Sequence, residues 1–420
     1  MTTKIAHIAI IGGGAAGCFA AIHVKRLLPE AKVSVWEAGR QALAKVAVTG
    51  GGRCNLTNSF RNAPSLERIY PRGSRLMKRL LHTFNHQDVM RWFEQHGVKL
   101  VMQDDDCVFP QSQDAMEIVH TLLNEMRDAG VALHTAHRVA ALTKEETGSY
   151  RLRFAHNMQP DVVTDAVLVT TGGSPKGAGL SILNALHVDI VPPVPSLYGL
   201  CVPHHPITTC SGLVVPNVSV SIRGAKHKAQ GPLLLTHWGI SGPAVLKLSS
   251  YAAPWLSERV FEAPIIVNWM GELRDEDTLH MLNDMALQHP QRQVAHVYPP
   301  HLGSKLWCIL LHESGVQPTR RWAEMGAKGM RRLANTLTAH CLPAKGRNRH
   351  KEEFVTCGGV ALSNIQPDTL ECRAHAGLYF AGEVLDVDAI TGGFNLQAAW
   401  SMGYVAAQNI AKKIRKQNSI

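Results

Sequence analysis

A glycine pattern close to the N-terminus constrains the fold of this chain more than any other feature. Gly12, Gly14 and Gly17 have the spacing G-x-G-x-x-G. They follow the apolar, β-branched run Ile5–Ile11, which predicts a short buried strand. The composition of Gly17–Leu28 predicts a helix directly after the glycines. A strand, a glycine turn and a helix in this order indicate the start of a βαβ unit.

The next strand ends at an acidic residue that completes this pattern. The strand expected over Val33–Trp36 leads into Glu37, 20 residues after Gly17. This is the arrangement of a dinucleotide-binding turn, in which helix N–H groups face a pyrophosphate and the acid accepts hydrogen bonds from ribose hydroxyls. A glycine-rich turn in another α/β fold is the alternative. We expect the cofactor contacts of this unit at Gly12, Gly14, Ala15, Ala16, Gly17 and Glu37.

Three later segments favour FAD as the dinucleotide. Thr170–Gly173 closes a strand, Leu378–Glu383 ends another near the C-terminus, and Gly392–Gln397 opens the last helix. The two strand ends let backbone approach an extended cofactor and place an acid beside a ribityl hydroxyl. The helix dipole stabilises negative charge on the flavin edge. The predicted FAD contacts therefore extend to Thr171, Gly172, Gly382, Glu383, Asn395, Leu396 and Gln397, and to Val139 at the end of a strand expected over 131–139.

Composition bounds the class of protein. A chain of 420 residues that is 45% hydrophobic can form two to three domains with sizeable cores. Its 43 Lys and Arg against 33 Asp and Glu give a formal net charge of +10, which suits an anionic partner. Nine scattered cysteines, with no C-x-x-C pair, exclude a complete disulfide framework and favour a reducing, cytoplasmic location. Glycines interrupt the apolar stretch 5–22, so we expect no membrane span.

The texture of the sequence changes twice along the chain. Three prolines, Pro192, Pro193 and Pro195, mark the first change, and short alternating strands follow. Near residue 346 the α/β texture returns, with a strand over 378–381 and a final helix. We therefore expect an α/β, Rossmann-like, doubly wound FAD-binding domain in two parts, 1–195 and 346–420, with an inserted domain at 196–345.

The motifs also resemble a known family, the FAD-binding flavoproteins of the BaiN-like or aminoacetone-oxidase-like type. The segments that carry the resemblance are TGGGRCNLTN at 49–58, VFP at 108–110, LTHWGISGP at 235–243, FVTCGGV at 354–360 and the stretch 382–397. The resemblance implies an FAD-dependent oxidoreductase whose inserted domain is part β-barrel and part helical. The chain departs from many relatives at Asp106-Cys107, where they have Gly-Arg, and in its shorter loop 174–177.

The resemblance leaves several activities open. One branch of the family is similar to a synthase of dihydrouridine in large-subunit ribosomal RNA, which is the leading expectation here. Other members are linked to amine oxidation or to reduction of steroid or bile-acid rings. A flavin-containing RNA-binding protein without turnover is a further alternative. NAD(P)H is the expected electron donor, and because no second G-x-G-x-x-G follows a clear strand, we expect it to dock transiently.

The segment Arg53–Asn55 is a candidate part of the reaction site. Reducing the C5–C6 bond of uracil requires a hydride at C6 and a proton at C5, and the Cys54 thiol is the candidate acid. Arg53 is expected to face phosphate or a flavin oxygen, and Asn55 to contact the cofactor. The alternative for Cys54 is a small packed residue whose backbone contacts FAD.

Histidines supply a second set of candidates. His237, before the Gly-Ile-Ser-Gly-Pro turn, is a candidate acid or orienting group on the substrate side. Its alternative is a structural role in tying the inserted domain to the sheet. His204, His205 and Cys210 lack an obvious fourth ligand, so we predict no metal site.

Three basic segments are candidate contacts for ribosomal RNA phosphates. The first is the stripe Arg72, Arg75, Arg79 and His82, whose three- and four-residue spacing favours a helical stretch over 72–97. The others are the group Arg320, Arg321, Lys328, Arg331 and Arg332, and the run 345–351. A solvated charged face is the alternative for each. No RNA-binding motif of the RRM or KH type is present, so the argument rests on charge.

Overall fold

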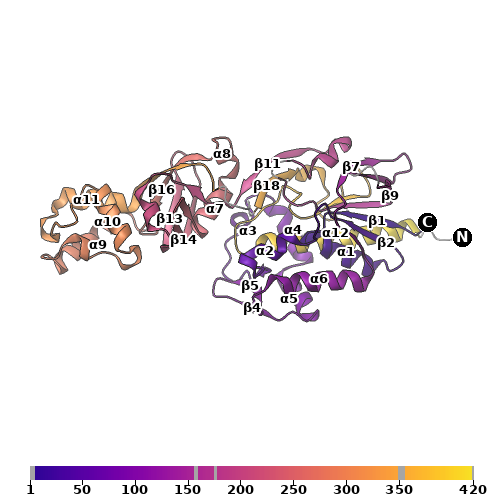
Figure 1. Cartoon of the computed structure of the whole chain (residues 1–420), viewed down its shortest axis with the longest axis horizontal. Coiled ribbons are helices and arrows are strands. Elements are labelled where there is room, and N and C mark those ends of the chain that lie inside the picture. Colours follow the sequence, from indigo (N-terminus) through magenta and orange to yellow (C-terminus); the bar gives the residue numbers. More distant parts are fainter. Residues whose placement is uncertain (1–4, 156–158, 175–176, 349–354, 419–420) are drawn as a thin grey trace. The chain divides into compact units, whose positions relative to one another are not determined.

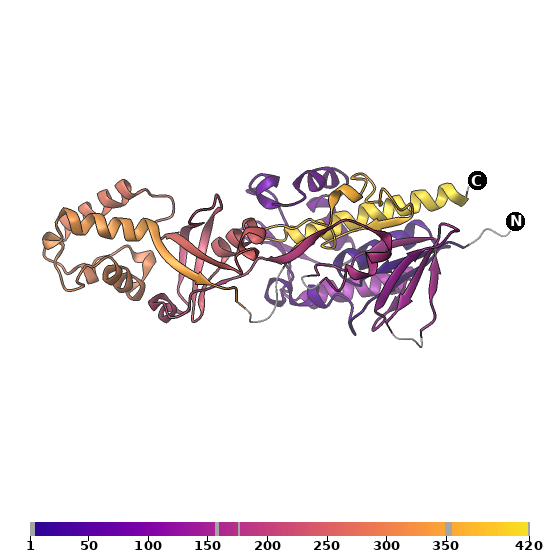
Figure 2. The same cartoon turned by 90° about the horizontal axis from the view of Figure 1, so that it is seen from above.

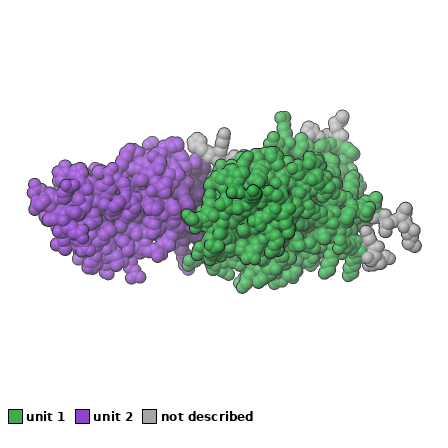
Figure 3. Space-filling view, turned by 90° about the horizontal axis from the view of Figure 1, so that it is seen from below, with its two compact units in different colours: residues 1–194, 355–420 green, residues 195–354 purple. Residues whose placement is uncertain are grey.

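The computed structural model describes residues 5–155, 159–174, 177–348 and 355–418. The chain forms two compact units (Figure 3). Unit 1 comprises residues 1–194 and 355–420, and unit 2 comprises residues 195–354. The domain boundaries expected from the sequence are 195/196 and 345/346. Several residues singled out above lie outside the described ranges, namely Pro175, Lys176, Arg349, His350, Lys351 and Phe354.

A five-stranded parallel sheet forms the centre of unit 1. Its spatial order is β19 (Leu378–Phe380), β10 (Ala166–Val169), β1 (His7–Ile11), β2 (Lys32–Trp36) and β6 (Ala132–His134). All of β10 and the last four residues of β1 are buried. Parallel strands covered on both faces read as continuous apolar runs, which is why these strands could be predicted.

Helices from both parts of unit 1 pack beside one another. They are α1 (Ala15–Leu27), α6 (Ala115–Ala129) and α12 (Phe394–Asn418), and α1 contacts both of the others (Figures 1 and 2). The backbones of α1 and α12 come so close that a Cβ added at Gly403 would lie 2.8 Å from the carbonyl oxygen of Ala16. The C-terminal helix α12 therefore packs directly against the first turn of α1, which follows the glycine turn.

Two elements of unit 1 differ from the sequence-based expectation. The basic helical stretch 72–97 is two helices, α4 (Ser74–Thr83) and α5 (His86–Gln95). Asn85 separates them because its side chain caps α5 in a reciprocal capping box with Asp88. The single strand expected over 131–139 is also wrong, since β6 ends at His134 and a new strand begins at Val139.

Smaller sheets complete unit 1. An antiparallel meander contains β7 (Val139–Lys144), β8 (Tyr150–Phe154) and β9 (Val162–Thr164). Two further sheets contain β3 (Thr57–Asn58), β5 (Cys107–Pro110) and β4 (Leu100–Met102), and β11 (Ile190–Ser196) with β18 (Val355–Val360). The short helices are α2 (Ala44–Gly52) and α3 (Leu66–Ile69).

Unit 2 contains a six-stranded antiparallel sheet that nearly closes into a barrel. The order is β12 (Leu200–Cys201), β15 (Gly239–Ser241), β14 (Lys228–Thr236), β13 (Val214–Ile222), β16 (Glu262–Asn268) and β17 (His340–Lys345). The two edges meet where the Cys201 N–H donates to the Gly346 carbonyl at 3.0 Å. Closure satisfies edge groups that would otherwise be free to pair with another chain.

A helical layer lies between β16 and β17 in the sequence. It contains α9 (Asp275–Gln288), α10 (Ser304–Glu313) and α11 (Gly326–Ala339), and α11 leads directly into β17 (Figure 2). Two more helices, α7 (Pro243–Tyr251) and α8 (Ala253–Ser257), connect β15 to β16. The barrel and the helices share one apolar core. The expected architecture is confirmed: an α/β unit with a parallel sheet, and an inserted barrel-like and helical region.

None of the helices in the described ranges is both long and apolar enough to cross a lipid bilayer.

Candidate functional site

The expected cofactor motifs lie in a row along the carboxyl edge of the parallel sheet. Glu37 follows β2, the turn 12–17 follows β1, Thr170–Gly173 follows β10, and Glu383 comes just after β19. Since adjacent strands are about 4.8 Å apart, the four strand ends span roughly 14 Å. An extended ligand can therefore contact all four motifs from one edge.

The first glycine turn combines close packing with open space. A Cβ at Gly12 would lie 2.3 Å from the Thr170 carbonyl oxygen, and one at Gly17 would lie 2.0 Å from the Gly12 carbonyl oxygen. A Cβ at Gly14, by contrast, would meet no described atom within 4 Å, and no described side chain caps α1 there. An open helix N-terminus with free N–H groups is a cradle for an anion, so these residues fit a pyrophosphate.

Glu37 is fixed beside this turn. Its carboxylate accepts hydrogen bonds from the backbone N–H of Gly13 at 2.7 Å and of Gly39 at 2.6 Å. Each carboxylate oxygen keeps a further lone pair for a ribose hydroxyl. The Glu37 carbonyl accepts from the His137 N–H at 2.8 Å. Buried Val139 is two residues after His137, so it follows a segment that is attached to this end of the site.

Glu383 is held at the other end of the row. Its carboxylate accepts from the Thr356 N–H at 2.7 Å and from Lys45 Nζ at 3.4 Å. A Cβ at Gly173 would lie 2.4 Å from one of its oxygens, and Gly172, with φ +72°, lies nearby. Glu383 is therefore a fixed, paired acid next to two glycines.

The N-terminus of α12 meets the segment 49–58. The Thr57 hydroxyl donates to Gln397 Oε1 at 2.5 Å, and Asn58 Nδ2 donates to the Gly392 carbonyl at 3.1 Å. In the orientation that satisfies both of its amide atoms, Asn55 donates to the Thr57 carbonyl and accepts from the Gly393 N–H at 3.2 Å. The glycine-rich segment 49–58 and the segment 392–397, which are far apart in the sequence, are therefore joined by direct hydrogen bonds.

Two side chains predicted as cofactor contacts are engaged in the protein itself. Gln397 is fully buried and also donates to Ser401 Oγ at 2.9 Å. The Asn395 amide donates to and accepts from the backbone of Ala389, both at 2.9 Å. What Asn395, Leu396 and Gln397 offer a ligand is therefore their place at the start of α12.

Cys54 lies in a loop of unusual backbone conformation. Gly50, Gly51, Gly52 and Cys54 have φ between +57° and +83°. The Cys54 side chain is wholly buried. Burial raises the pKa of its thiol to about 12, although a hydrogen bond with the Thr49 side chain opposes the shift. A buried, protonated thiol favours the alternative in which Cys54 is a packed residue.

Arg53 is exposed next to Cys54. Its guanidinium lies over the Phe109 ring, 4.5 Å from the ring centre, and Nε donates to the Gly50 carbonyl at 3.2 Å. A second contact, from Nη1 to Gln113 Oε1, is 3.4 Å long. These contacts hold Arg53 in place while its charge stays accessible.

Asp106, where many relatives of the resembled family have glycine, lies in the left-handed region with φ +64°. Its carboxylate accepts from Ser59 Oγ at 2.7 Å and from the Asn62 N–H at 2.9 Å. Aspartate tolerates this conformation better than most residues, and these bonds anchor it.

His237 occupies an exposed position in the turn between β14 and β15 of unit 2. Its ring makes no hydrogen bond with a residue of the described ranges. The neighbouring residues explain the motif structurally, because a Cβ at Gly199 would lie 2.4 Å from the Trp238 ring and one at Gly239 would lie 2.2 Å from the Leu200 carbonyl oxygen. The tight barrel edge thus accounts for Trp238 and Gly239.

His205 belongs to a group with Glu313 and buried His340 that the sequence did not reveal. Glu313 Oε2 lies 2.5 Å from His340 Nε2, and Glu313 Oε1 lies 3.5 Å from His205 Nε2. Trp269 Nε1 donates to His340 Nδ1 at 3.0 Å, and the Ile207 N–H donates to His205 Nδ1 at 3.4 Å. His205, Glu313 and His340 offer three ligand atoms within 4.8 Å of one another. At His340 the Trp269 N–H donates to Nδ1, which favours a ring proton on Nε2, toward Glu313, and leaves that ring without a lone pair for a metal.

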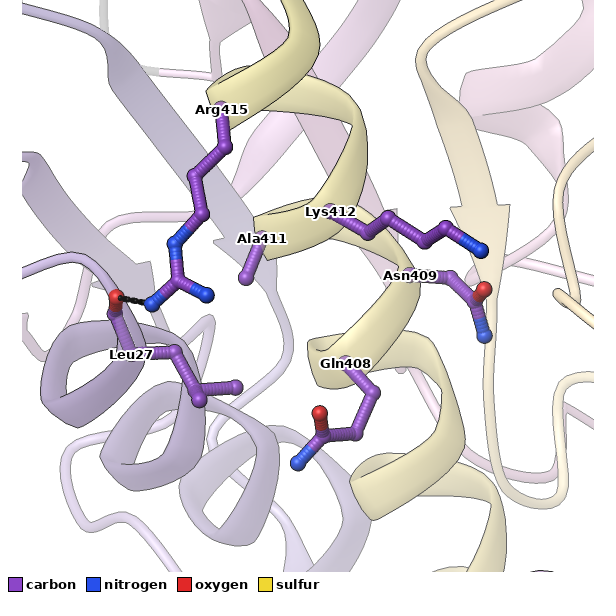
Figure 4. A pocket seen from close by; sticks show the side chains of 6 residues that line it. All are labelled: Leu27, Gln408, Asn409, Ala411, Lys412 and Arg415. Atoms are coloured by element: carbon purple, nitrogen blue, oxygen red, sulfur yellow. Dashed lines mark hydrogen bonds between the residues drawn. The ribbon is translucent and has the colours of Figure 1, made fainter.

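A pocket at the far end of α1 is separate from this row of motifs (Figure 4). Arg415 Nη2 donates to the Leu27 carbonyl at 2.5 Å across it. A helix of 13 residues is roughly 20 Å long, so this pocket lies well away from Gly14. The residues that line it are Leu27, Gln408, Asn409, Ala411, Lys412 and Arg415.

The sequence reasoning missed several residues that build the site. Thr170 Oγ1 donates to the Gly12 carbonyl at 2.8 Å and fixes the first turn. Lys45 and Thr356 position Glu383. Thr170 and Thr356 lie in the segments 170–173 and 354–360 that were singled out, but neither was given a role, and Lys45 carries no local signal.

Known proteins resemble this chain over nearly its whole length. A family model described as "HI0933-like protein Rossmann domain" matches residues 6–409. A 3-dehydro-bile acid delta(4,6)-reductase of Clostridium scindens is 29% identical over 414 residues, covering 97% of this chain and 99% of the relative. A ribosomal RNA dihydrouridine synthase of Escherichia coli is 29% identical over 414 residues, covering 96% and 97%. The solved quinol fumarate reductase FrdA of E. coli shares the fold, with a TM-score of 0.51 and 15% identity over 99% of this chain and 72% of that chain.

Proposed function

Because the chain belongs to the HI0933-like Rossmann family, we propose that it is an FAD-dependent reductase that saturates a carbon–carbon double bond. The family and the fold support an FAD-dependent oxidoreductase, the class that the sequence predicts. Our proposal adds the reaction, NAD(P)H as the electron donor and, as the first choice of substrate, a uridine in ribosomal RNA. We place the protein in the cytoplasm, since all nine cysteines are free thiols.

The row of motifs along one sheet edge is the observation that carries the proposed FAD site. The start of α1 at Gly14–Gly17 would hold the pyrophosphate, Glu37 the ribose hydroxyls, and Glu383 the ribityl chain. The segments at Arg53–Asn55 and at the start of α12 would contact the ring system. Bound FAD would supply the two-electron chemistry of the reaction.

The names of the two relatives support the choice of reaction. One relative is named as a reductase and the other as a dihydrouridine synthase. Dihydrouridine differs from uridine by two hydrogens across the C5–C6 bond, so both names describe addition of hydrogen to an unsaturated ring. The formal charge of +10 favours the RNA substrate over a neutral small molecule.

The test is to measure dihydrouridine in ribosomal RNA from strains with and without the gene, by mass spectrometry of nucleosides. We expect one dihydrouridine position to disappear in the deletion strain and to return with the wild-type gene. An unchanged dihydrouridine content refutes the RNA substrate.

The second candidate is a small-molecule ene-reductase or amine oxidase, favoured by the likeness to the bile-acid reductase. Rapid mixing distinguishes the candidates: the NAD(P)H-reduced protein should be reoxidised by unmodified ribosomal RNA under the first proposal and by a steroid enone if it is an ene-reductase. An amine oxidase should instead have its oxidised flavin reduced by an amine and reoxidised by oxygen. Reduction without reoxidation by any substrate favours a flavin-containing RNA-binding protein without turnover.

A further inference from the structure

We propose that a basic surface on the helical layer of unit 2 binds the phosphates of the RNA substrate. This inference rests on the proposed function, which supplies the RNA. We call it the α11 surface, and it consists of Arg292, Arg320, Arg321, Lys328, Arg331 and Arg332. All six side chains belong to exposed residues.

Backbone hydrogen bonds bring the first three cations together. The Val294 N–H donates to the Arg320 carbonyl at 2.9 Å. The Trp322 N–H donates to the Arg292 carbonyl at 3.0 Å. Two segments paired in this antiparallel way lie about 5 Å apart, so Arg292 lies beside the pair Arg320 and Arg321. Buried Val294 and Trp322 anchor the two segments to the core.

Helix α11 supplies the other three cations. Lys328, Arg331 and Arg332 have the i, i+3, i+4 spacing that places side chains on neighbouring parts of one helix face. The opposite face is buried through residues that include Met330 and Leu333. The single turn 322–324 connects Arg321 to the start of this helix, so both groups of cations belong to one end of the helical layer.

The cations of the α11 surface make no ion pair with a carboxylate of the described chain. The nearest acid in sequence, Glu324, accepts from the backbone N–H of Arg321 at 3.2 Å rather than from its guanidinium. In contrast, two members of the other predicted basic stripe are neutralised: Arg72 pairs with buried Asp388, and Arg79 pairs with Asp368. The predicted basic segments therefore differ: Arg72 and Arg79 are paired with acids, whereas the positive charge of the α11 surface is available to a partner.

The chemistry of these side chains fits a phosphate backbone. Five of the six are arginines, whose planar guanidinium groups form bidentate hydrogen bonds with phosphate oxygens. Several unpaired cations close together match the regular negative charge of a nucleic acid, whose binding releases counterions. A contact of this kind orients the RNA without reading its sequence.

The test compares two triple variants of the full-length flavoprotein that lose equal charge. One is Lys328→Ala/Arg331→Ala/Arg332→Ala, in the α11 surface. The matched control is Arg79→Ala/Arg91→Ala/Arg127→Ala, three exposed arginines that each pair with an aspartate. The probe is an unmodified ribosomal RNA transcript, and Kd is measured by filter binding at several KCl concentrations.

We expect the α11 variant to bind about 10-fold or more weakly near 0.1 M salt, with the slope of log Kd against log salt reduced by about 2. Flavin content and reduction by NAD(P)H without RNA should match the wild type. Equal weakening in both triple variants, or no weakening in the α11 variant, overturns the inference.

The same measurements separate this inference from the proposed function. A wild-type protein that forms dihydrouridine but whose RNA affinity ignores the α11 substitutions refutes only the surface. A protein that binds RNA through α11 but leaves the dihydrouridine content of the cell unchanged on deletion supports the surface and refutes the reaction.

Discussion

The Thr57 hydroxyl donates a 2.5 Å hydrogen bond to the side-chain oxygen of Gln397, and both residues are fully buried. The Gln397 Nε2 group in turn donates to the Ser401 hydroxyl, which donates to the Phe84 carbonyl at 2.7 Å. This link holds the glycine-rich segment after α2 against the start of the C-terminal helix. The part of the proposed cofactor site formed by the segment 49–58 and the start of α12 therefore requires the C-terminal part of the chain to pack against the N-terminal part.

Replacing Thr57 with valine tests this link. Thr57→Val keeps the β-branched shape but leaves the buried Gln397 oxygen without its donor, which costs about 1–3 kcal/mol in the free energy of unfolding. Urea unfolding of the purified protein measures the loss, and flavin content is expected to fall with it. The control is Thr143→Val, on β7 of the same unit, where the hydroxyl makes no hydrogen bond with a described residue. A Thr57→Val protein as stable as the control would show that the link contributes little.

The open space at Gly14 separates cofactor binding from folding. Gly14 has φ −87°, which any residue adopts, and a Cβ there would touch no described atom within 4 Å. We therefore expect Gly14→Val to fold normally but to lose most of its FAD, because the side chain fills the space proposed for the pyrophosphate. Circular dichroism and flavin absorbance measure the two properties. The control Gly329→Ala, inside α11, should keep both. Normal FAD content in Gly14→Val would show that the pyrophosphate does not bind at Gly14.

The burial of Cys54 predicts a mild effect of its removal. Because burial raises the pKa of the thiol to about 12 and the side chain is wholly buried, we expect Cys54→Ala to keep its flavin and to turn over within about threefold of the wild type. Single-turnover reoxidation of the reduced protein by its substrate measures this. A loss of 100-fold or more with normal flavin content would restore Cys54 as the proton donor.

His23 makes the stability of unit 1 depend on pH. Burial lowers its pKa from 6.5 to about 3, with smaller effects from the charges of Arg26 and His96. The folded protein keeps this imidazole neutral while the unfolded chain protonates it. The stability is therefore fully present above pH 6.5 and is lost as the pH falls from 6.5 towards 3, at up to about 1.4 kcal/mol per pH unit.

Urea unfolding between pH 7.5 and 4 measures this slope. His23→Phe, whose ring can replace the contacts with Phe19 and Tyr404, should flatten it by up to one proton. The control His280→Gln, exposed on α9, should leave the slope unchanged. Identical slopes for the wild type and His23→Phe would contradict the assignment.

Local sequence signals predicted the first half of the proposed site. The strand, the three glycines and Glu37 lie within one short stretch, and each has a steric or hydrogen-bonding reason to be there. The capping box at Asn85 and Asp88 was equally local and readable, and overlooking it led to the prediction of one helix in place of two.

Contacts between distant segments could not be predicted in this way. Glu383 meets Thr356 of β18 and Lys45 of α2, and His205 meets Glu313 of α10 and His340 of β17, so each contact joins segments of different elements. The hydrogen bond from the Trp269 indole N–H to Nδ1 of His340 joins two residues that are 71 positions apart. Periodicity and spacing hold no information about such contacts.

The visible spectrum and FAD stoichiometry of the freshly purified wild-type protein, read beside the Gly14→Val variant, test the proposed site with the fewest assumptions. We predict a yellow wild type with one FAD per chain and a folded, nearly colourless variant. A colourless wild-type protein that cannot be reconstituted with FAD would contradict the account.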